Sequence, residues 1–400
     1  MRSALTLVHR YVGLALAGFL ALAGLTGSAI AFYHELDEGL NPHLYRASAV
    51  GEPLPVAELV ARIERAEPRA RVSGIGLAHE AGRSLVVRVS PRSERALAFD
   101  ELFVDPVDGS VVGRRLFGEC CFQRERLLPF LYSLHYSLHL PGRVGVILMG
   151  LVALAWTLDC FVALALTLPR GTAFWRRWGR ALRIETRASR YRLLHDTHRA
   201  SGLWAWGLLL MLAVSGVALS LRDEVFRPVV GAFSELAPTP LERAQQLGIA
   251  PGAPALGFAD AIAAARRVAH ARSWPADPVY AFHAAELGGF GVGMVRPGED
   301  PEAGLGASWI YLSDRDGRFI TAELTGEGSA GDVFAQLQFP LHSGHILGLP
   351  GRIAISLLGL AVAGLSATGV YVWAVKQAAR VRSRARSDGA LTPASRAEGV

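Results

Sequence analysis

Four long apolar stretches constrain the fold of this 400-residue chain more than any other feature. A helix needs about 20 apolar residues to cross a hydrocarbon core of ~30 Å. The stretches that meet this length are residues 11–33, 144–168, 202–221 and 353–375. The composition agrees, because 51% of the residues are hydrophobic and 19% are charged, which is too apolar for an ordinary soluble protein. The sequence therefore predicts a membrane protein with an all-α four-helix transmembrane bundle.

Flanking charge predicts how these helices are oriented. The connection at 169–201 is rich in arginine, and the tail at 376–400 is also basic. By the positive-inside rule, both segments and the start of the chain face the cytoplasm. Segments 34–143 and 222–352 then lie outside. The net charge of +6 comes from these arginines, so it indicates a surface facing lipid headgroups and gives no reason to expect nucleic acid.

The first apolar stretch could also be a cleavable signal peptide, with a small-residue site at Gly27-Ser28-Ala29. Its apolar run is longer than the 7 to 15 residues of a signal-peptide core. We therefore expect residues 1–33 to be a cytoplasmic start followed by a retained span.

The chain contains an internal repeat in which each half runs helix, external segment, helix. A His-Arg-x-x-Gly motif begins at His9 and again at His198, 189 positions later. A Leu-Pro-Gly-Arg motif at 140–143 recurs at 349–352, with an offset of 209. The halves have the same orientation, so a pseudo-two-fold axis lies along the membrane normal. Equivalent residues should face each other across that axis at the same depth.

Each external segment is predicted to be a small α+β module that packs on its twin or on the helix ends. The predicted elements are helices at 57–67 and 258–269 and strands at 84–89 and 279–283. An Asp-Gly turn at Asp108 and another at Asp316 predict a hairpin in each module.

Histidines cluster where the chain enters or leaves an apolar stretch. They are His9, His135, His139, His195, His198, His342 and His345. An ionisable side chain in such a place is costly and usually has a partner or a task. Imidazoles at both ends of a bundle suggest that the task is to hold redox-active metal across the bilayer.

His9 and His198 are related by the ungapped repeat and lie at the cytoplasmic edge. Four residues on, Gly13 and Gly202 occupy the same helix faces and leave backbone that a flat macrocycle could approach. Two interpretations of this pair fit the sequence equally well. In the first, both imidazoles hold a b-type haem. In the second, the helices pack through small residues and each histidine hydrogen-bonds to a carbonyl.

On the external side, His135 and His342 both precede the Leu-Pro-Gly-Arg motif, but matching them requires a two-residue gap. Strict alignment places His135 opposite Gly344 instead. His139 and His345 are further candidates, because residues three or four apart share a helix face and could chelate a transition metal. A span rises ~35 Å at 1.5 Å per residue, so one cofactor cannot reach both layers. Two haems are therefore predicted.

Asp159 lies well inside the second apolar stretch. An intramembrane carboxylate can serve in proton handling or bind the polar edge of a cofactor. The alternative is a hydrogen bond to Trp156, Thr157 or a neighbouring helix.

The 3 cysteines are Cys160, within the second stretch, and the adjacent Cys120 and Cys121 outside. They form neither a disulfide framework nor a zinc or covalent-haem motif. The adjacent pair could be a redox couple, but two unpaired thiols are the simpler prediction.

Long, ordered motifs run through most of the chain. They are HRYVGLALAGFLALAGLTGS with ELDEGLNP, FLYSLHYSLHLPGR, WTLDCFVALALTLPR with FWRRWGRALRI, YRLLHDTHRASGLWAW, and LHSGHILGLPGR. From about residue 5 to residue 376, the chain resembles the PepSY-associated transmembrane helix family. The resemblance implies a multi-pass protein of the bacterial inner membrane, with two external PepSY modules and both termini in the cytoplasm.

Family members of the ferric-siderophore reductase type bind two b-type haems and deliver electrons to iron outside the membrane. The resemblance implies His9 and His198 as inner axial ligands, and His135 and His342 as outer ones. The positions that vary more among relatives are His139, His195 and His345.

Three functions follow from these observations. The first is a haem reductase of ferric chelates such as ferric siderophores, with electrons from a quinol or a cytoplasmic reductase. The second is a PepSY regulatory or binding protein without haem, and the third is an iron or siderophore uptake accessory. The sequence lacks a G-x-G-x-x-G motif after a strand, so a flavin or nicotinamide domain is not expected. The fold alone does not choose among these functions.

Overall fold

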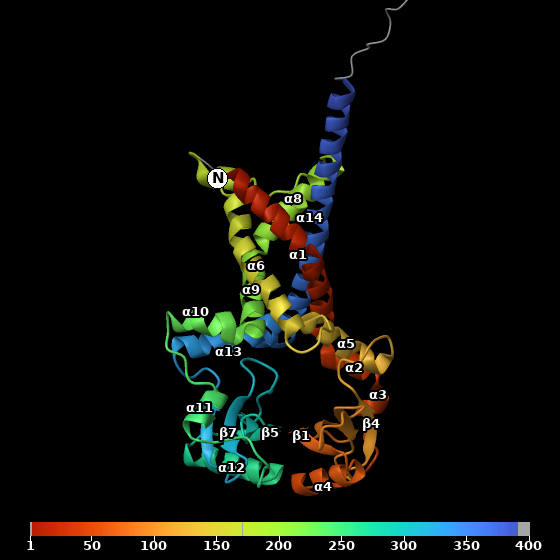
Figure 1. Cartoon of the computed structure of the whole chain (residues 1–400), viewed down its shortest axis with the longest axis vertical. Helices are drawn as coiled ribbons and strands as arrows, with labels where there is room; N and C mark the ends of the chain where they lie inside the picture. The colour runs from red at the N-terminus through yellow and green to blue at the C-terminus, as the bar shows by residue number, and fades with distance from the viewer. Residues whose placement is uncertain (1, 170, 391–400) are drawn as a thin grey trace, which may run out of the picture.

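The structure is a computed structural model that describes residues 2–169 and 171–390. Met1, Arg170 and residues 391–400 lie outside the described residues, and they include the far part of the predicted basic tail. Figure 1 shows a bundle of long helices, a β-sheet, and a belt of short helices between them. We call the end of the bundle next to the sheet the sheet end, and the opposite end the free end.

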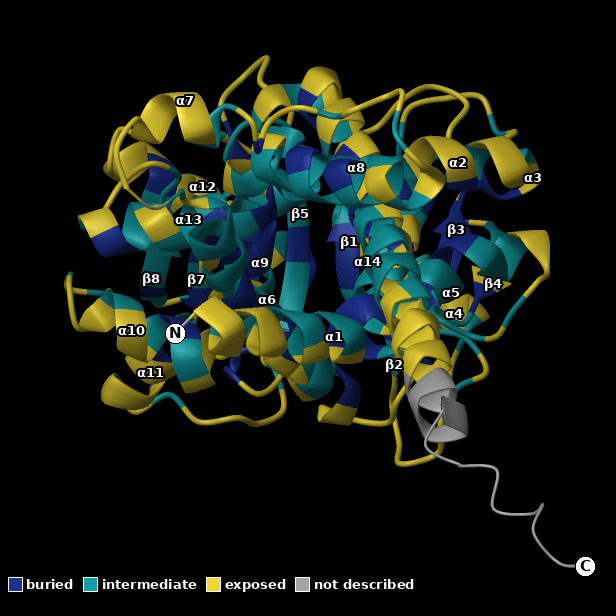
Figure 2. Cartoon of the chain, turned by 90° about the horizontal axis from the view of Figure 1, so that it is seen from above, coloured by how far each residue is buried: buried dark blue, intermediate teal, exposed yellow. Residues whose placement is uncertain are grey.

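Long helices form the bundle. They are α1 (Arg2–Ile30), α6 (Val144–Thr167), α8 (Arg190–Trp204), α9 (Trp206–Ser220) and α14 (Gly348–Ala390). Among the described residues, three helices are long and apolar enough to cross a membrane, and α8 with α9 adds a fourth if this bent pair is one span. The chain is thus a membrane-associated protein. Seen from above, the far turns of α14 are exposed (Figure 2).

The third predicted span differs most from the structure. Instead of one helix at 202–221, α8 and α9 meet at Ala205 with a bend of 69°. Ser201 and Gly202 precede the break, and small residues of this kind are a common cause of helix kinks. Because α8 begins at Arg190, the helix starts before the predicted span and includes both His195 and His198.

The two halves of the repeat interleave, because α1 packs along α14 and α6 packs along α9. α1 and α14 cross at Gly24 and Gly359, where an added Cβ would overlap backbone oxygen of the other helix. The hydroxyls of Ser28 and Ser356 each donate to the other's backbone carbonyl, at 2.8 and 3.0 Å. Small residues and hydroxyls are typical of close helix crossings in membranes.

Two ion pairs follow the predicted pseudo-two-fold axis. Glu35 pairs with Arg352 at 2.6 Å, and Glu224 pairs with Arg143 at 2.7 Å. The offsets of 189 and 209 relate one pair to the other. Each pair joins the first half of the chain to the second.

Short helices lie in the connections between the longer elements. They are α2 (Tyr33–Leu40), α3 (Pro42–Tyr45), α5 (Arg124–Ser137), α7 (Phe174–Trp178), η1 (Arg222–Phe226), α10 (Arg227–Gly231), α11 (Pro240–Gln246), α13 (Ala330–Ser343) and η2 (His345–Leu347). At the sheet end, α5 packs on α1 and α6, while α13 packs on α9 and α14 (Figure 1). These two helices are counterparts in the repeat.

Eight antiparallel strands form one sheet, in the order β4-β3-β2-β1-β5-β6-β7-β8. They are β1 (Ala70–Gly76), β2 (Leu85–Pro91), β3 (Glu101–Val104), β4 (Val111–Arg115), β5 (Asp277–Ala284), β6 (Gly289–Val295), β7 (Ser308–Ser313) and β8 (Phe319–Glu323). β1 pairs with β5, with Ile75 opposite Ala281. The two predicted modules therefore share one continuous sheet.

The predicted module helices form as α4 (Val56–Ala66) and α12 (Phe258–Ala271). Their apolar sides pack on the sheet in a single core that includes Leu59, Ile63 and Phe258. The predicted hairpins form as β3 with β4 and β7 with β8. Strands β1 and β6 were not predicted.

Candidate functional site

Four histidines form two pairs at opposite ends of the bundle. At the free end, the ring centroids of His9 on α1 and His198 on α8 are 6.3 Å apart. At the sheet end, those of His135 on α5 and His342 on α13 are 6.2 Å apart. Each pair takes one histidine from each half, as the repeat requires.

The inner pair, at the free end, is held through Nδ1. His9 Nδ1 lies 2.9 Å from Asp159 Oδ2 on α6. His198 Nδ1 lies 3.1 Å from both the Leu365 carbonyl and the Thr368 hydroxyl on α14. Asp159 and Thr368 are counterparts at the offset of 209. The hydrogen bond of Asp159 thus goes to a neighbouring helix, and its partner is a paired histidine.

The outer pair, at the sheet end, is held in the same way. His135 Nδ1 lies 3.1 Å from both the Ala23 carbonyl and the Thr26 hydroxyl. His342 Nδ1 lies 2.8 Å from the Ser215 hydroxyl. Thr26 and Ser215 are counterparts at the ungapped offset of 189. The gapped match of His135 with His342 is therefore the one that the structure adopts.

These contacts place the proton on Nδ1 of each ring. Carbonyl and carboxylate oxygens only accept, so His9, His135 and His198 must donate. The Ser215 hydroxyl already donates to backbone carbonyls at 2.8 and 3.1 Å, so its oxygen accepts from His342. Within the described residues, Nε2 makes no hydrogen bond in any of the four rings. A histidine that binds a metal usually has this arrangement.

The outer histidines are neutral at physiological pH. Burial and, to a lesser extent, the nearby His135 lower the pKa of His342 to about 4. Burial also lowers the pKa of His135 below its ordinary value. Neutral imidazole is the form that ligates metals.

The spacing of both pairs fits two imidazoles on opposite sides of one iron. Imidazole nitrogen binds a metal at about 2.0 Å, and the ring centre lies about 1.1 Å beyond it, so two opposed rings have centres about 6 Å apart. Among the described residues, no three histidine, cysteine or carboxylate side chains form a group that could hold a bare ion. Haem needs only axial ligands from the protein. Ring packing alone would allow the distances, but it would not explain four free Nε2 atoms.

A cavity of about 610 Å³ adjoins the inner pair. Its walls include His9, His198 and Asp159, together with Gly13 and Gly202. A Cβ added to Gly13 would meet nothing within 4 Å. The backbone at this glycine is therefore open to a large flat group.

Cationic side chains line the same cavity. They are Arg2, Arg10, Arg199, Lys376 and Arg380. Arg10 Nε is buried and, within the described residues, has no hydrogen-bond partner. Such cations could neutralise and bind acidic groups such as the two propionates of a haem. His195 also lines the cavity, and its Nδ1 lies 3.4 Å from Asp196 Oδ1.

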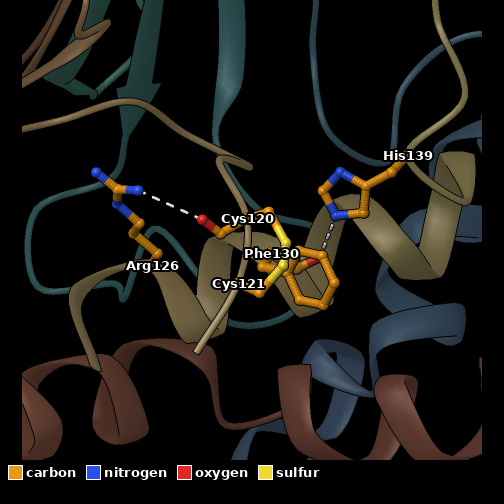
Figure 3. Close-up of a disulfide and its surroundings, with 5 residues drawn as sticks. All are labelled: Cys120, Cys121, Arg126, Phe130 and His139. Carbon is orange, nitrogen blue, oxygen red and sulfur yellow. Dashed lines mark hydrogen bonds between the residues drawn. A yellow bond between two sulfur atoms is a disulfide. The ribbon is translucent and has the colours of Figure 1, made fainter. Parts of the chain in front are cut away.

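His139 does not join the outer pair, so the prediction that it shares a helix face with His135 is wrong. α5 ends at Ser137, and Leu138 and His139 adopt φ of 54° and 56°. The His139 ring therefore turns back and stacks on Phe130, with centroids 4.4 Å apart (Figure 3). Its Nε2 donates to the Phe130 carbonyl at 2.9 Å.

His345 is displaced for the same reason. α13 ends at Ser343, and Gly344 turns the chain with φ of 83°. His345 Nδ1 then donates to the Glu302 carbonyl at 2.6 Å. The helix spacing that would place His345 beside His342 does not continue past the helix end.

Cys120 and Cys121 are joined in a disulfide, which corrects the prediction of two unpaired thiols (Figure 3). The pair precedes α5, and Arg126 donates to the Cys120 carbonyl at 3.3 Å. Cys160 is a free, buried thiol.

The residues that hold the histidines were not predicted from the sequence. Apart from Asp159, they are Thr26, Ser215, Thr368 and the carbonyls of Ala23 and Leu365. The repeat offsets carried the signal, because 189 aligns Thr26 with Ser215 and 209 aligns Asp159 with Thr368.

Fold and site together define a class: membrane-associated proteins in which two repeated halves meet around paired histidines and share an antiparallel sheet. Residues 6–376 match the family described as PepSY-associated TM region, and the chain belongs to this family. The matched range includes both histidine pairs and both halves of the sheet. None of the curated proteins matches the chain.

Proposed function

We propose that this protein carries electrons across a bacterial inner membrane through two b-type haems and reduces ferric chelates on the outer side. The two histidine pairs carry this proposal. They lie at opposite ends of the bundle, with ring centroids 6.3 and 6.2 Å apart. Each of the four Nδ1 atoms is engaged by a fixed acceptor, which leaves Nε2 for iron.

The inner haem would be held by His9 and His198, and the outer haem by His135 and His342. Haem iron supplies one-electron transfer at both positions. The protein fixes the tautomer of each ligand and leaves space at Gly13. Cations around the inner cavity supply counter-charge for carboxylates.

The free end is proposed to face the cytoplasm. The inner cavity at this end is lined by arginines and Lys376, and basic residues favour the cytoplasmic side of a membrane. The sheet then lies outside. A ferric chelate would meet the outer haem between the sheet and the belt of short helices.

Electrons would come from a quinol or a cytoplasmic reductase. A quinol that becomes a quinone gives up two electrons and two protons, so one quinol reduces two iron(III) ions to iron(II). Iron(III) chelates such as ferric siderophores use hard oxygen ligands, which hold iron(II) less tightly. Reduction therefore releases the metal.

An optical redox titration of the purified protein tests the proposal. We expect a b-type spectrum that titrates as two components. His135→Ala should remove the outer component, whereas His139→Ala should keep both, because His139 is bonded to Phe130. Membranes given a quinol and a ferric chelate should form iron(II), detected with an iron(II)-specific chromophore.

A folded but colourless protein would contradict the proposal and favour a haem-free regulatory or binding role for the PepSY segment. Equal loss of haem in His135→Ala and His139→Ala would refute the ligand assignment.

A further inference from the structure

The two inner histidines are held by different chemistry, although the repeat makes them counterparts. His9 Nδ1 is 2.9 Å from a carboxylate oxygen of Asp159. His198 Nδ1 meets a carbonyl and the Thr368 hydroxyl, each at 3.1 Å. In the outer pair, both partners are hydroxyls or carbonyls. A carboxylate therefore holds only one of these four histidines.

Asp159 is placed where its charge acts on the ligand. The residue is 8% exposed and lines the inner cavity. Its Oδ1 is buried and, within the described residues, has no hydrogen-bond partner. A buried carboxylate with a single hydrogen bond is costly unless a positive charge compensates it. A ferric haem carries one more positive charge than a ferrous haem, so Asp159 would stabilise the oxidised form.

A carboxylate on Nδ1–H also makes imidazole a stronger electron donor to its metal. Both effects would favour iron(III) over iron(II) and so would lower the reduction potential of a haem at the inner site. Thr26, Ser215 and Thr368 accept hydrogen bonds without a negative charge. They leave the other three ligands weaker donors than His9.

We infer that Asp159 is a positioning residue that makes the inner haem the lower-potential site of the two, so that electrons pass outward from the inner haem to the outer haem. This inference rests on the proposed function. The repeat supplies two similar sites, and this departure from symmetry gives the electron path its direction.

The test is a spectroelectrochemical titration of the full-length Asp159→Thr protein, which places at 159 the residue found at 368. We expect the midpoint potential of the inner haem to rise by at least about 59 mV. For one electron, this corresponds to a tenfold change in the iron(III)/iron(II) ratio. The outer midpoint should stay unchanged and serves as an internal control. The inner ferric signal in electron paramagnetic resonance should also change its g values.

Two further variants sharpen the test. Thr368→Asp adds a carboxylate to the second ligand and should lower the inner midpoint further. Asp159→Asn keeps an acceptor oxygen without the charge and should raise the midpoint, as Asp159→Thr does. If Asp159→Thr fails to bind the inner haem, Asp159→Asn still measures the effect of the charge on the midpoint potential.

The outcomes separate this inference from the proposed function. A colourless wild-type protein would overturn the proposed function itself. Two haems with an inner midpoint that does not rise in Asp159→Thr or Asp159→Asn would overturn the inference alone. Loss of the inner haem from both variants would also reject it, because Asp159 would then be needed for binding instead of for tuning.

Discussion

Gly13 keeps a space open one helical turn from His9. The glycine lines the inner cavity, and a Cβ there would meet nothing within 4 Å. A large side chain at this position would therefore enter the cavity without disturbing its neighbours. Gly207 on α9 is also open, but it is exposed and lies outside this cavity.

This contrast gives a test of where the inner haem binds. Gly13→Phe should lower haem content from two to one per chain, because the ring fills space that the macrocycle needs. Gly207→Phe is the matched control and should keep two. Haem per protein, measured as the pyridine haemochrome, reports the result. Equal haem content in the two variants would place the inner haem elsewhere.

The four paired histidines could be predicted from the repeat and the family resemblance. The residues that hold them could not, because Thr26 and Ser215 look like ordinary helix-packing residues until a ring is placed beside them. His139 and His345 were misjudged because α5 ends at Ser137 and α13 at Ser343. Sequence spacing predicts a shared face only while the helix continues.

A buried ion cluster ties the first half of the sheet to the belt of short helices. Arg115 on β4 donates to Asp37 on α2 and to Glu101 on β3, each at 2.7 Å. The three side chains are 3% exposed or less. Burial disfavours the guanidinium charge, but the two carboxylates raise the pKa of Arg115 above its ordinary value.

Arg115→Ala should destabilise the protein by about 3–5 kcal/mol, because it leaves two buried carboxylates without their cation. Arg114→Ala is the neighbouring control. Arg114 is 52% exposed and pairs with Glu67 at the surface, where an ion pair contributes about 0–1 kcal/mol. The melting temperatures of the two variants, measured by thermal unfolding in detergent, compare their stabilities. Similar melting temperatures for the two variants would show that the cluster is not needed for stability.

The long helices were predictable from the length of their apolar stretches, apart from the break at Ala205, and the module helices because their apolar residues lie on one face. β6 was not, because Gly289, Gly291 and Gly293 lower its strand propensity. The structure shows why they are there. A Cβ at Gly291 would overlap the Phe282 ring on β5, and one at Gly293 would lie 3.2 Å from Trp309 on β7. Neighbouring aromatic rings occupy the space above Gly291 and Gly293, and the Leu312 carbonyl occupies the space above Gly289.

The molecule as a whole is two half-chains that complete each other. α1 packs with α14, α6 packs with α9, and β1 pairs with β5 across the halves. Sequence patterns predicted two similar halves and some of the strands within each half. The junction could not be predicted, because nothing in the pattern of β1 or β5 indicates which edges pair.

Splitting the chain between Glu185 and Thr186 tests this dependence. We expect residues 1–185 or 186–400 alone to show no haem spectrum, because each half carries one histidine of each pair. Co-expression should restore it. The control replaces His9 and His135 with alanine in the first half, and this should abolish the restored colour. A haem spectrum from either half alone would contradict the shared-ligand arrangement.

The division of each histidine pair between the halves has a consequence for the cell. A group bound by His9 and His198, or by His135 and His342, would clasp the first half to the second. A ligand that binds only the folded state stabilises that state by mass action. Proteases degrade chains that remain unfolded. If the bound group is the proposed haem, the amount of this protein in the cell should follow the supply of haem. Under the proposed function, a cell depleted of iron would lose this protein unless it reserved haem for it.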